Sequence, residues 1–132
     1  MREILRSWAE RKLNRYYAIE RPAQANEVWQ RQTNGQMYAR VVLSARPAES
    51  FSFRCQVTWP DKAASFEQAV LDGILDALCA RFMPVLGAAF VLEDIRLDER
   101  TSTVIAFYMA ARQATEKIIK GNIQVFPPTE PN

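Results

Sequence analysis

Four arginines and one tyrosine are the best candidates for a binding surface in this sequence. Guanidinium groups contact phosphates and aromatic rings stack on bases, so such a set on one sheet face is typical of RNA binding. The candidates lie in neighbouring predicted strands and are Arg31, Tyr38, Arg40, Arg46 and Arg54. A solvated sheet face is the alternative interpretation, because long charged side chains are common there.

Catalytic chemistry has little support. The 132 residues contain no histidine, which excludes a Ser-His-Asp triad, a Cys-His pair and His-ligated zinc. Glu93-Asp94 with Asp98-Glu99 has the groups to bind Mg²⁺ or do acid–base work, but a solvated turn is the favoured interpretation. The four glycines are scattered, so no phosphate-binding loop is present. We therefore expect no enzymatic activity, no metal, no cofactor and no bound nucleotide.

The strands that must position the arginines follow from alternating apolar and polar residues. Residues 27–33 predict a short strand, Asn34-Gly35 a turn, and residues 36–46 a second strand. Residues 51–59 alternate without error, with Phe51, Phe53, Cys55, Val57 and Trp59 on one side. Because a short turn joins the last two strands, they are expected to pair as an antiparallel hairpin.

Two helices and one more strand complete the pattern. Residues 65–82 predict a helix that begins with a capping box from Ser65 to Gln68. Residues 88–97 predict a strand, and one of Thr101, Ser102 or Thr103 caps a helix that ends before Gly121. The expected fold is α+β: a two-layer sandwich with a mostly antiparallel four-stranded sheet and two helices on one face.

The first 17 residues predict a basic amphipathic helix. It can dock on its own domain, bind a partner or second copy, or lie on a membrane surface, and docking is favoured. Its candidate partner-binding residues are Ile4, Leu5, Trp8 and Tyr16. The predicted division is a helical segment over 1–22, a domain over 23–121 and a short tail over 122–132.

Charge and hydropathy limit the compartment and the partners that can be expected for the protein. The net charge is +2, but residues 1–62 hold 11 Lys and Arg against 6 Asp and Glu, whereas residues 63–132 hold 6 against 9. No secretory signal and no stretch of apolar residues long enough to span a bilayer is found. We expect a cytoplasmic protein without membrane association, with Cys55 and Cys79 reduced and buried.

Several collinear motifs carry a family resemblance. Residues 31–38 read RQTNGQMY, residues 51–53 read FSF, and residues 69–78 read AVLDGILDAL. The last helix contains Ala106-Phe107 followed by Ala110-Ala111. In order and spacing, residues 17–120 resemble domain IV of translational elongation factor G and of the tetracycline-resistance ribosomal protection proteins.

The resemblance implies a ribosomal-protein-S5-domain-2-like fold with βββαβα order and a left-handed crossover. It also implies the ribosome or structured RNA as a partner, through a non-enzymatic, translation-related module. A G-x-x-x-x-G-K-[ST] run is absent, so no GTPase module is expected. The tip loop at 97–101 lacks the histidine of the family. The alternative is a protein-interaction or assembly module that kept the fold, lost RNA contact and uses the N-terminal helix as its partner or dimer element.

Overall fold

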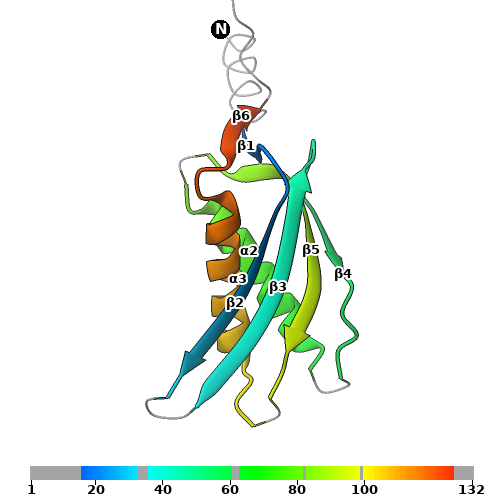
Figure 1. Cartoon of the computed structure of the whole chain (residues 1–132), viewed down its shortest axis with the longest axis vertical. Helices are drawn as coiled ribbons and strands as arrows, with labels where there is room; N and C mark the ends of the chain where they lie inside the picture. The colour runs from blue at the N-terminus through cyan, green and yellow to red at the C-terminus, as the bar shows by residue number, and fades with distance from the viewer. Residues whose placement is uncertain (1–15, 33–35, 61–62, 82, 99, 127–132) are drawn as a thin grey trace, which may run out of the picture.

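A single open sheet of six strands, with two helices on one face, forms the described part of the chain (Figure 1). This computed structural model describes residues 16–32, 36–60, 63–81, 83–98 and 100–126. The elements in chain order are β1 (Tyr16–Ile19), β2 (Ala23–Arg31), β3 (Met37–Pro47), β4 (Ser52–Cys55), α2 (Ser65–Cys79), β5 (Val85–Arg96), α3 (Val104–Ile119) and β6 (Ile123–Phe126). The expected mixed α+β class is therefore confirmed.

The sheet is mixed, and its centre is β5. The strand order is β2-β3-β5-β1-β6, with β4 also paired to β5. Strand β5 is antiparallel to β3 but parallel to both β1 and β4. The prediction of a mostly antiparallel four-stranded sheet is thus wrong in strand number and in part of its pairing.

The predicted hairpin of the strands at 36–46 and 51–59 is also wrong, because β5 lies between β3 and β4. The physical reason is burial. Strand β5 has apolar residues on both faces over its first eight positions, and most of them are inaccessible to solvent. A central position with strands on both sides buries those residues, whereas β4 alternates and suits an edge.

The hydrophobic core lies between the sheet and the helices. Alternate residues of β3 face it, namely Ala39, Val41, Leu43 and Ala45, as the sequence pattern predicted. Helices α2 and α3 pack tightly against each other at Gly73, where an added Cβ would collide with the carbonyl oxygen of Tyr108. This close contact explains why a glycine stands in the middle of a helix.

The helix ends agree with the sequence in two places and differ in one. Thr103 caps α3 by accepting from the N–H of Ala106 at 3.1 Å, and Gly121 follows the helix with φ 63°. The predicted capping box of α2 is wrong. Ala64 occupies the cap position in a helical conformation, and Gln68 instead donates to Asp72 at 2.9 Å. Ser65 already belongs to the helix, so its hydroxyl does not cap the first turn.

Both ends of the described chain join the sheet. Residues 16–19, expected at the end of an N-terminal helix, form β1, and β6 pairs with it in antiparallel register. The four side chains Tyr-Tyr-Ala-Ile suit a strand, and Ala18 and Ile19 are buried. The boundaries predicted at 22 and 121 therefore cut off two strands that belong to the sheet. The rest of the predicted helix, residues 1–15, lies outside the described residues.

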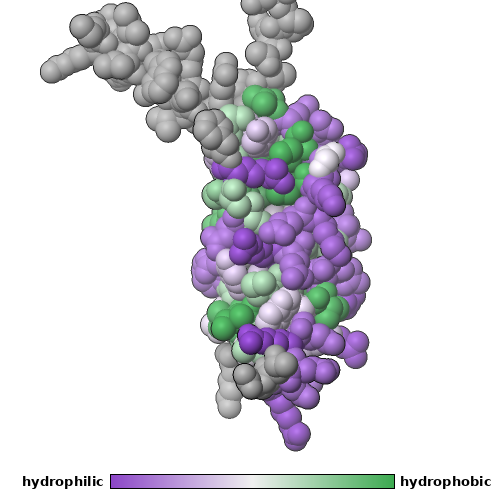
Figure 2. All heavy atoms as spheres, turned by 90° about the vertical axis from the view of Figure 1, so that its left-hand side faces the viewer, coloured by the Kyte–Doolittle hydropathy of each residue, from purple (hydrophilic) through white to green (hydrophobic). Residues whose placement is uncertain are grey.

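The two ends of the molecule are formed by different strands. Strands β1 and β6 lie at one end, and the end of β2, the start of β3 and the end of β5 lie at the other, which we call the tip (Figure 1). On the side that carries α3, hydrophilic atoms predominate and apolar atoms form separate spots (Figure 2). Among the described residues, no helix combines the length and apolarity that crossing a bilayer requires.

Candidate nucleic-acid interface

The sheet face that the helices leave uncovered carries most of the predicted arginines. Tyr38, Arg40 and Arg46 alternate with the buried residues of β3 and so lie on that face. Arg54 of β4 is next to Val91, which in turn pairs with Ser44 of β3. At about 3.3 Å per residue, Arg40 and Arg46 are about 20 Å apart along the strand. The arginines therefore form an elongated row rather than one cluster.

Arg31 does not belong to this face, which corrects the prediction. It pairs with Met37 and lies on the same side of β2 as Glu27 and Trp29. That side faces the helices, because Glu27 forms an ion pair with Lys117 of α3 at 2.6 Å. The strand alternation thus points Arg31 toward the helix side at the exposed end of β2.

Arg40 is partly occupied by neighbouring side chains. Its Nε donates to Oδ1 of Asn26 at 2.8 Å, and its Nη1 lies 3.7 Å from a carboxylate oxygen of Asp94. Its side chain is 27% exposed. Arg46 and Arg54 are exposed and form no ion pair with any other described residue. They are therefore the more accessible cations of the row.

Arg96 completes the face, and the candidate set drawn from the sequence missed it. It is the partner of Arg40 in the β3–β5 register and is exposed to solvent. The alternation Asp94, Ile95, Arg96, Leu97 held the signal, because Ile95 and Leu97 are half-buried while the two charged residues are exposed. What the sequence did not supply was the pairing of β5 with β3.

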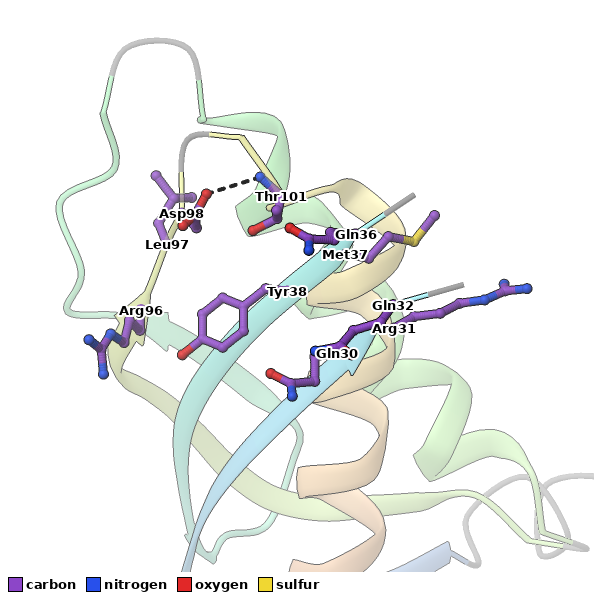
Figure 3. Close-up of a pocket in the computed structure, with 10 residues that line it drawn as sticks. All are labelled: Gln30, Arg31, Gln32, Gln36, Met37, Tyr38, Arg96, Leu97, Asp98 and Thr101. Carbon is purple, nitrogen blue, oxygen red and sulfur yellow. Dashed lines mark hydrogen bonds between the residues drawn. The ribbon is translucent and has the colours of Figure 1, made fainter. Parts of the chain in front are cut away.

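A polar hollow of about 530 Å³ opens at the tip (Figure 3). Its lining comes from the end of β2, the start of β3 and the loop after β5, and consists of Gln30, Arg31, Gln32, Gln36, Met37, Tyr38, Arg96, Leu97, Asp98 and Thr101. The side chains of Tyr38, Gln30 and Arg96 project to one side, whereas those of Arg31 and Met37 project to the other (Figure 3). The hollow therefore joins the arginine row at its tip end.

The loop that walls the hollow is fixed by hydrogen bonds. Oδ1 of Asp98 accepts from the N–H groups of Arg100 at 2.9 Å and Thr101 at 3.1 Å. The bond from Arg100 is the main reason that the pKa of the Asp98 carboxyl lies below its ordinary value. Ser102 Oγ donates to the carbonyl oxygen of Tyr38 at 2.8 Å. The loop is thereby joined to β3.

The described acidic residues of the cluster at 93–99 each bind a neighbouring group of the protein. Glu93 accepts from the amide of Gln24, Asp94 pairs with an arginine of β3, and Asp98 is bound to backbone N–H groups. Glu99 lies outside the described residues. Among the residues that are described, no group of three or more potential metal ligands comes together. Each described carboxylate of the cluster thus has a partner close by. This arrangement is typical of a solvated turn and sheet surface.

The cysteines are free, but the prediction that both are buried is wrong. Cys55 is half-buried and Cys79 is exposed at the end of α2. Burial is the largest cause that raises the pKa of the Cys55 thiol, and a hydrogen bond to Glu67 adds to it. A reactive thiolate needs a lowered pKa, so Cys55 is a packing residue. Cys79 follows the last buried turn of α2, which explains its exposure.

Of the predicted partner-binding residues, Ile4, Leu5 and Trp8 lie outside the described residues. Tyr16 is in β1, where its hydroxyl donates to the carbonyl oxygen of Glu49. It therefore contributes to a strand of the sheet and not to the helical face on which it was predicted.

No family model and no curated protein matches the sequence. A crystal structure of a protein from Thermus thermophilus is similar to this chain, with a TM-score of 0.75 and 24% sequence identity over 85% of the chain. The match covers 18% of the Thermus protein, so this chain spans less than a fifth of that protein's length. At this identity the similarity supports the fold alone.

Proposed function

We propose that this chain is a non-enzymatic module that binds structured RNA, with ribosomal RNA as its target, and that it is related to domain IV of elongation factor G. The observation that carries the proposal is the uncovered sheet face, where exposed arginines from three strands lie in one row with Tyr38 at its tip end. The residues 31–38 that carry the family resemblance end at this tyrosine.

The charges on the uncovered sheet face suit it to binding phosphates. Arg46, Arg54 and Arg96 supply charges on β3, β4 and β5, while Glu93 and Asp94 offset part of them on β5. Double-stranded DNA carries about one phosphate charge per 1.7 Å of its axis, and at a comparable density in RNA a row about 20 Å long faces several phosphates. Contacts of this kind position RNA without reading its sequence. The proposed role is binding in the cytoplasm without catalysis.

Fluorescence anisotropy with a labelled RNA hairpin, over a series of salt concentrations, tests the proposal. The double substitution Arg54→Glu with Arg96→Glu is expected to weaken binding by at least about tenfold and to reduce the slope of log K against log salt by about two. Arg112→Glu on α3 is the control and is compared with Arg54→Glu alone, because the two single substitutions make the same charge change, one on the helix side, where Arg112 pairs with Glu116, and one on the arginine row.

Equal affinity of the double variant and the wild type would contradict the assignment of the face. If the wild type binds no RNA and light scattering instead shows a defined oligomer, the assembly module becomes the better description.

A further inference from the structure

We infer that the hollow at the tip is a binding site for one unpaired base of the RNA, so that the module recognises looped or single-stranded RNA in preference to a continuous duplex. This inference rests on the proposed function and names the RNA element that its tip receives. The carrying observation is the combination of an aromatic ring, side-chain amides and a fixed wall around one polar hollow.

Tyr38 supplies the stacking surface. Its side chain is half-buried and lies between Arg96 and Gln30, which project to the same side of the sheet (Figure 3). A tyrosine ring and a guanidinium plane both stack on bases. Every base has two π-faces, so this pair accepts a base only if the base has left its own stack. A base inside a continuous duplex does not present those faces.

The polar lining suits a base better than a phosphate. Gln30, Gln32 and Gln36 line the hollow, and a glutamine amide offers both a donor and an acceptor. Asp98 adds a carboxylate that its hydrogen bonds keep ionised. This carboxylate can accept from the amino groups of bases, whereas a phosphate has no donor to offer it. Phosphates therefore bind along the arginine row, and the base enters the hollow.

The site is formed before RNA arrives. Both backbone groups of Tyr38 are bonded to the loop after β5: its N–H donates to the carbonyl oxygen of Thr101 at 2.9 Å, and its carbonyl accepts from Ser102 at 2.8 Å. The backbone of Tyr38 is thus joined to the loop by hydrogen bonds that do not involve the side chain itself. Substitutions at the ring leave those contacts available, which makes Tyr38 a clean position to test.

The experiment compares three RNAs on the wild-type protein by fluorescence anisotropy: a hairpin with a five-nucleotide loop, the same hairpin with abasic residues in its loop, and a continuous duplex of the same length. The hairpin is expected to bind about tenfold more tightly than the other two, which is the range of one base stacked on an aromatic side chain. Equal affinity for all three would overturn the inference and leave the proposed function intact.

Three protein variants separate stacking from folding. Tyr38→Leu is expected to remove the preference for the hairpin, whereas Tyr38→Phe keeps it because the ring remains. Gln30→Ala is expected to weaken hairpin binding several-fold without affecting the duplex, and it stands in if Tyr38→Leu fails to fold. Gln24→Ala, on the same face of β2 but at the other end, is the control. If the Tyr38→Leu protein is folded and still prefers the hairpin, the inference is wrong. Failure of all RNA binding, by contrast, defeats the proposed function.

Discussion

Ser102 and Tyr38 are 64 residues apart in sequence, yet the hydroxyl of Ser102 joins them at the tip. It donates to the carbonyl oxygen of Tyr38 at 2.8 Å and accepts from the N–H of Asp98 at 2.9 Å. One side chain thus bonds the loop to itself and to β3. The start of β3 and the wall of the hollow therefore move as one unit.

Removing this hydroxyl tests its role. Ser102→Ala is expected to lower the free energy of unfolding by about 1 kcal/mol, because two hydrogen bonds between protein groups are lost. Amide exchange at Asp98 is expected to become faster in the same variant. Urea unfolding and hydrogen exchange measure the two effects. Ser52→Ala, at an exposed position of β4, is expected to change neither, and equal unfolding midpoints for the two variants would contradict the role of Ser102.

Acid is expected to weaken the tip through Asp98. Its pKa is lowered in the folded protein below the ordinary 3.8, so the stabilisation is present above the unfolded pKa and is lost as the pH falls through the folded pKa. The wild type should therefore lose more stability than Asp98→Asn as the pH is lowered from neutral to below that ordinary value. Urea midpoints at the two pH values measure this difference. Parallel losses in both proteins would show that Asp98 does not contribute to the acid limb.

Gly73 is expected to tolerate no side chain. A Cβ there collides with the carbonyl oxygen of Tyr108, so Gly73→Ala should destabilise the protein by about 1–3 kcal/mol. The sign is informative, because alanine in a helix interior normally stabilises relative to glycine. Thermal or urea unfolding measures the change. Asp72→Ala, on the exposed side of the same helix, is the control, and a stabilised Gly73→Ala protein would mean that α2 and α3 are further apart.

The two thiols are expected to react at different rates with a thiol-specific reagent at neutral pH. Cys79 is exposed and should react rapidly. Cys55 should react slowly, because it is half-buried and its raised pKa lowers the thiolate fraction. Absorbance during labelling should show two phases, and Cys79→Ser should abolish the fast one. A single fast phase that accounts for both thiols would contradict the burial of Cys55.

Local patterns predicted which side of β3 and of β4 faces the core, whereas the pairing of distant strands was not predicted. The alternation in β3 identified both the core residues and the face of Tyr38, because side-chain direction depends on neighbouring residues alone. The place of β5 between β3 and β4 depends on contacts between distant segments. The short turn at 47–50 led to the wrong prediction that β3 pairs with β4, because closeness in sequence was the only information on strand pairing.

The candidate site shows the same division. Tyr38, Arg40, Arg46 and Arg54 lie on the predicted face. Arg31 was misplaced because its side of β2 depends on the register across residues 32–36, which the turn alone did not fix. Arg96 was missed because a charged residue near the end of β5 becomes part of the face only when that strand pairs with β3.

Strand β5 also determines the order in which the protein can form during synthesis. Strands β1, β3 and β4 all pair with it, so until residues 85–96 are made, β2 with β3 is the described strand pair that can close. The inner edge of β3 stays open for that time, and open strand edges invite association between chains. Translation that is slow before residue 85 should therefore favour aggregation, whereas release of β5 lets β1, β3 and β4 pair with it. The sheet is complete only when β6 follows and pairs with β1.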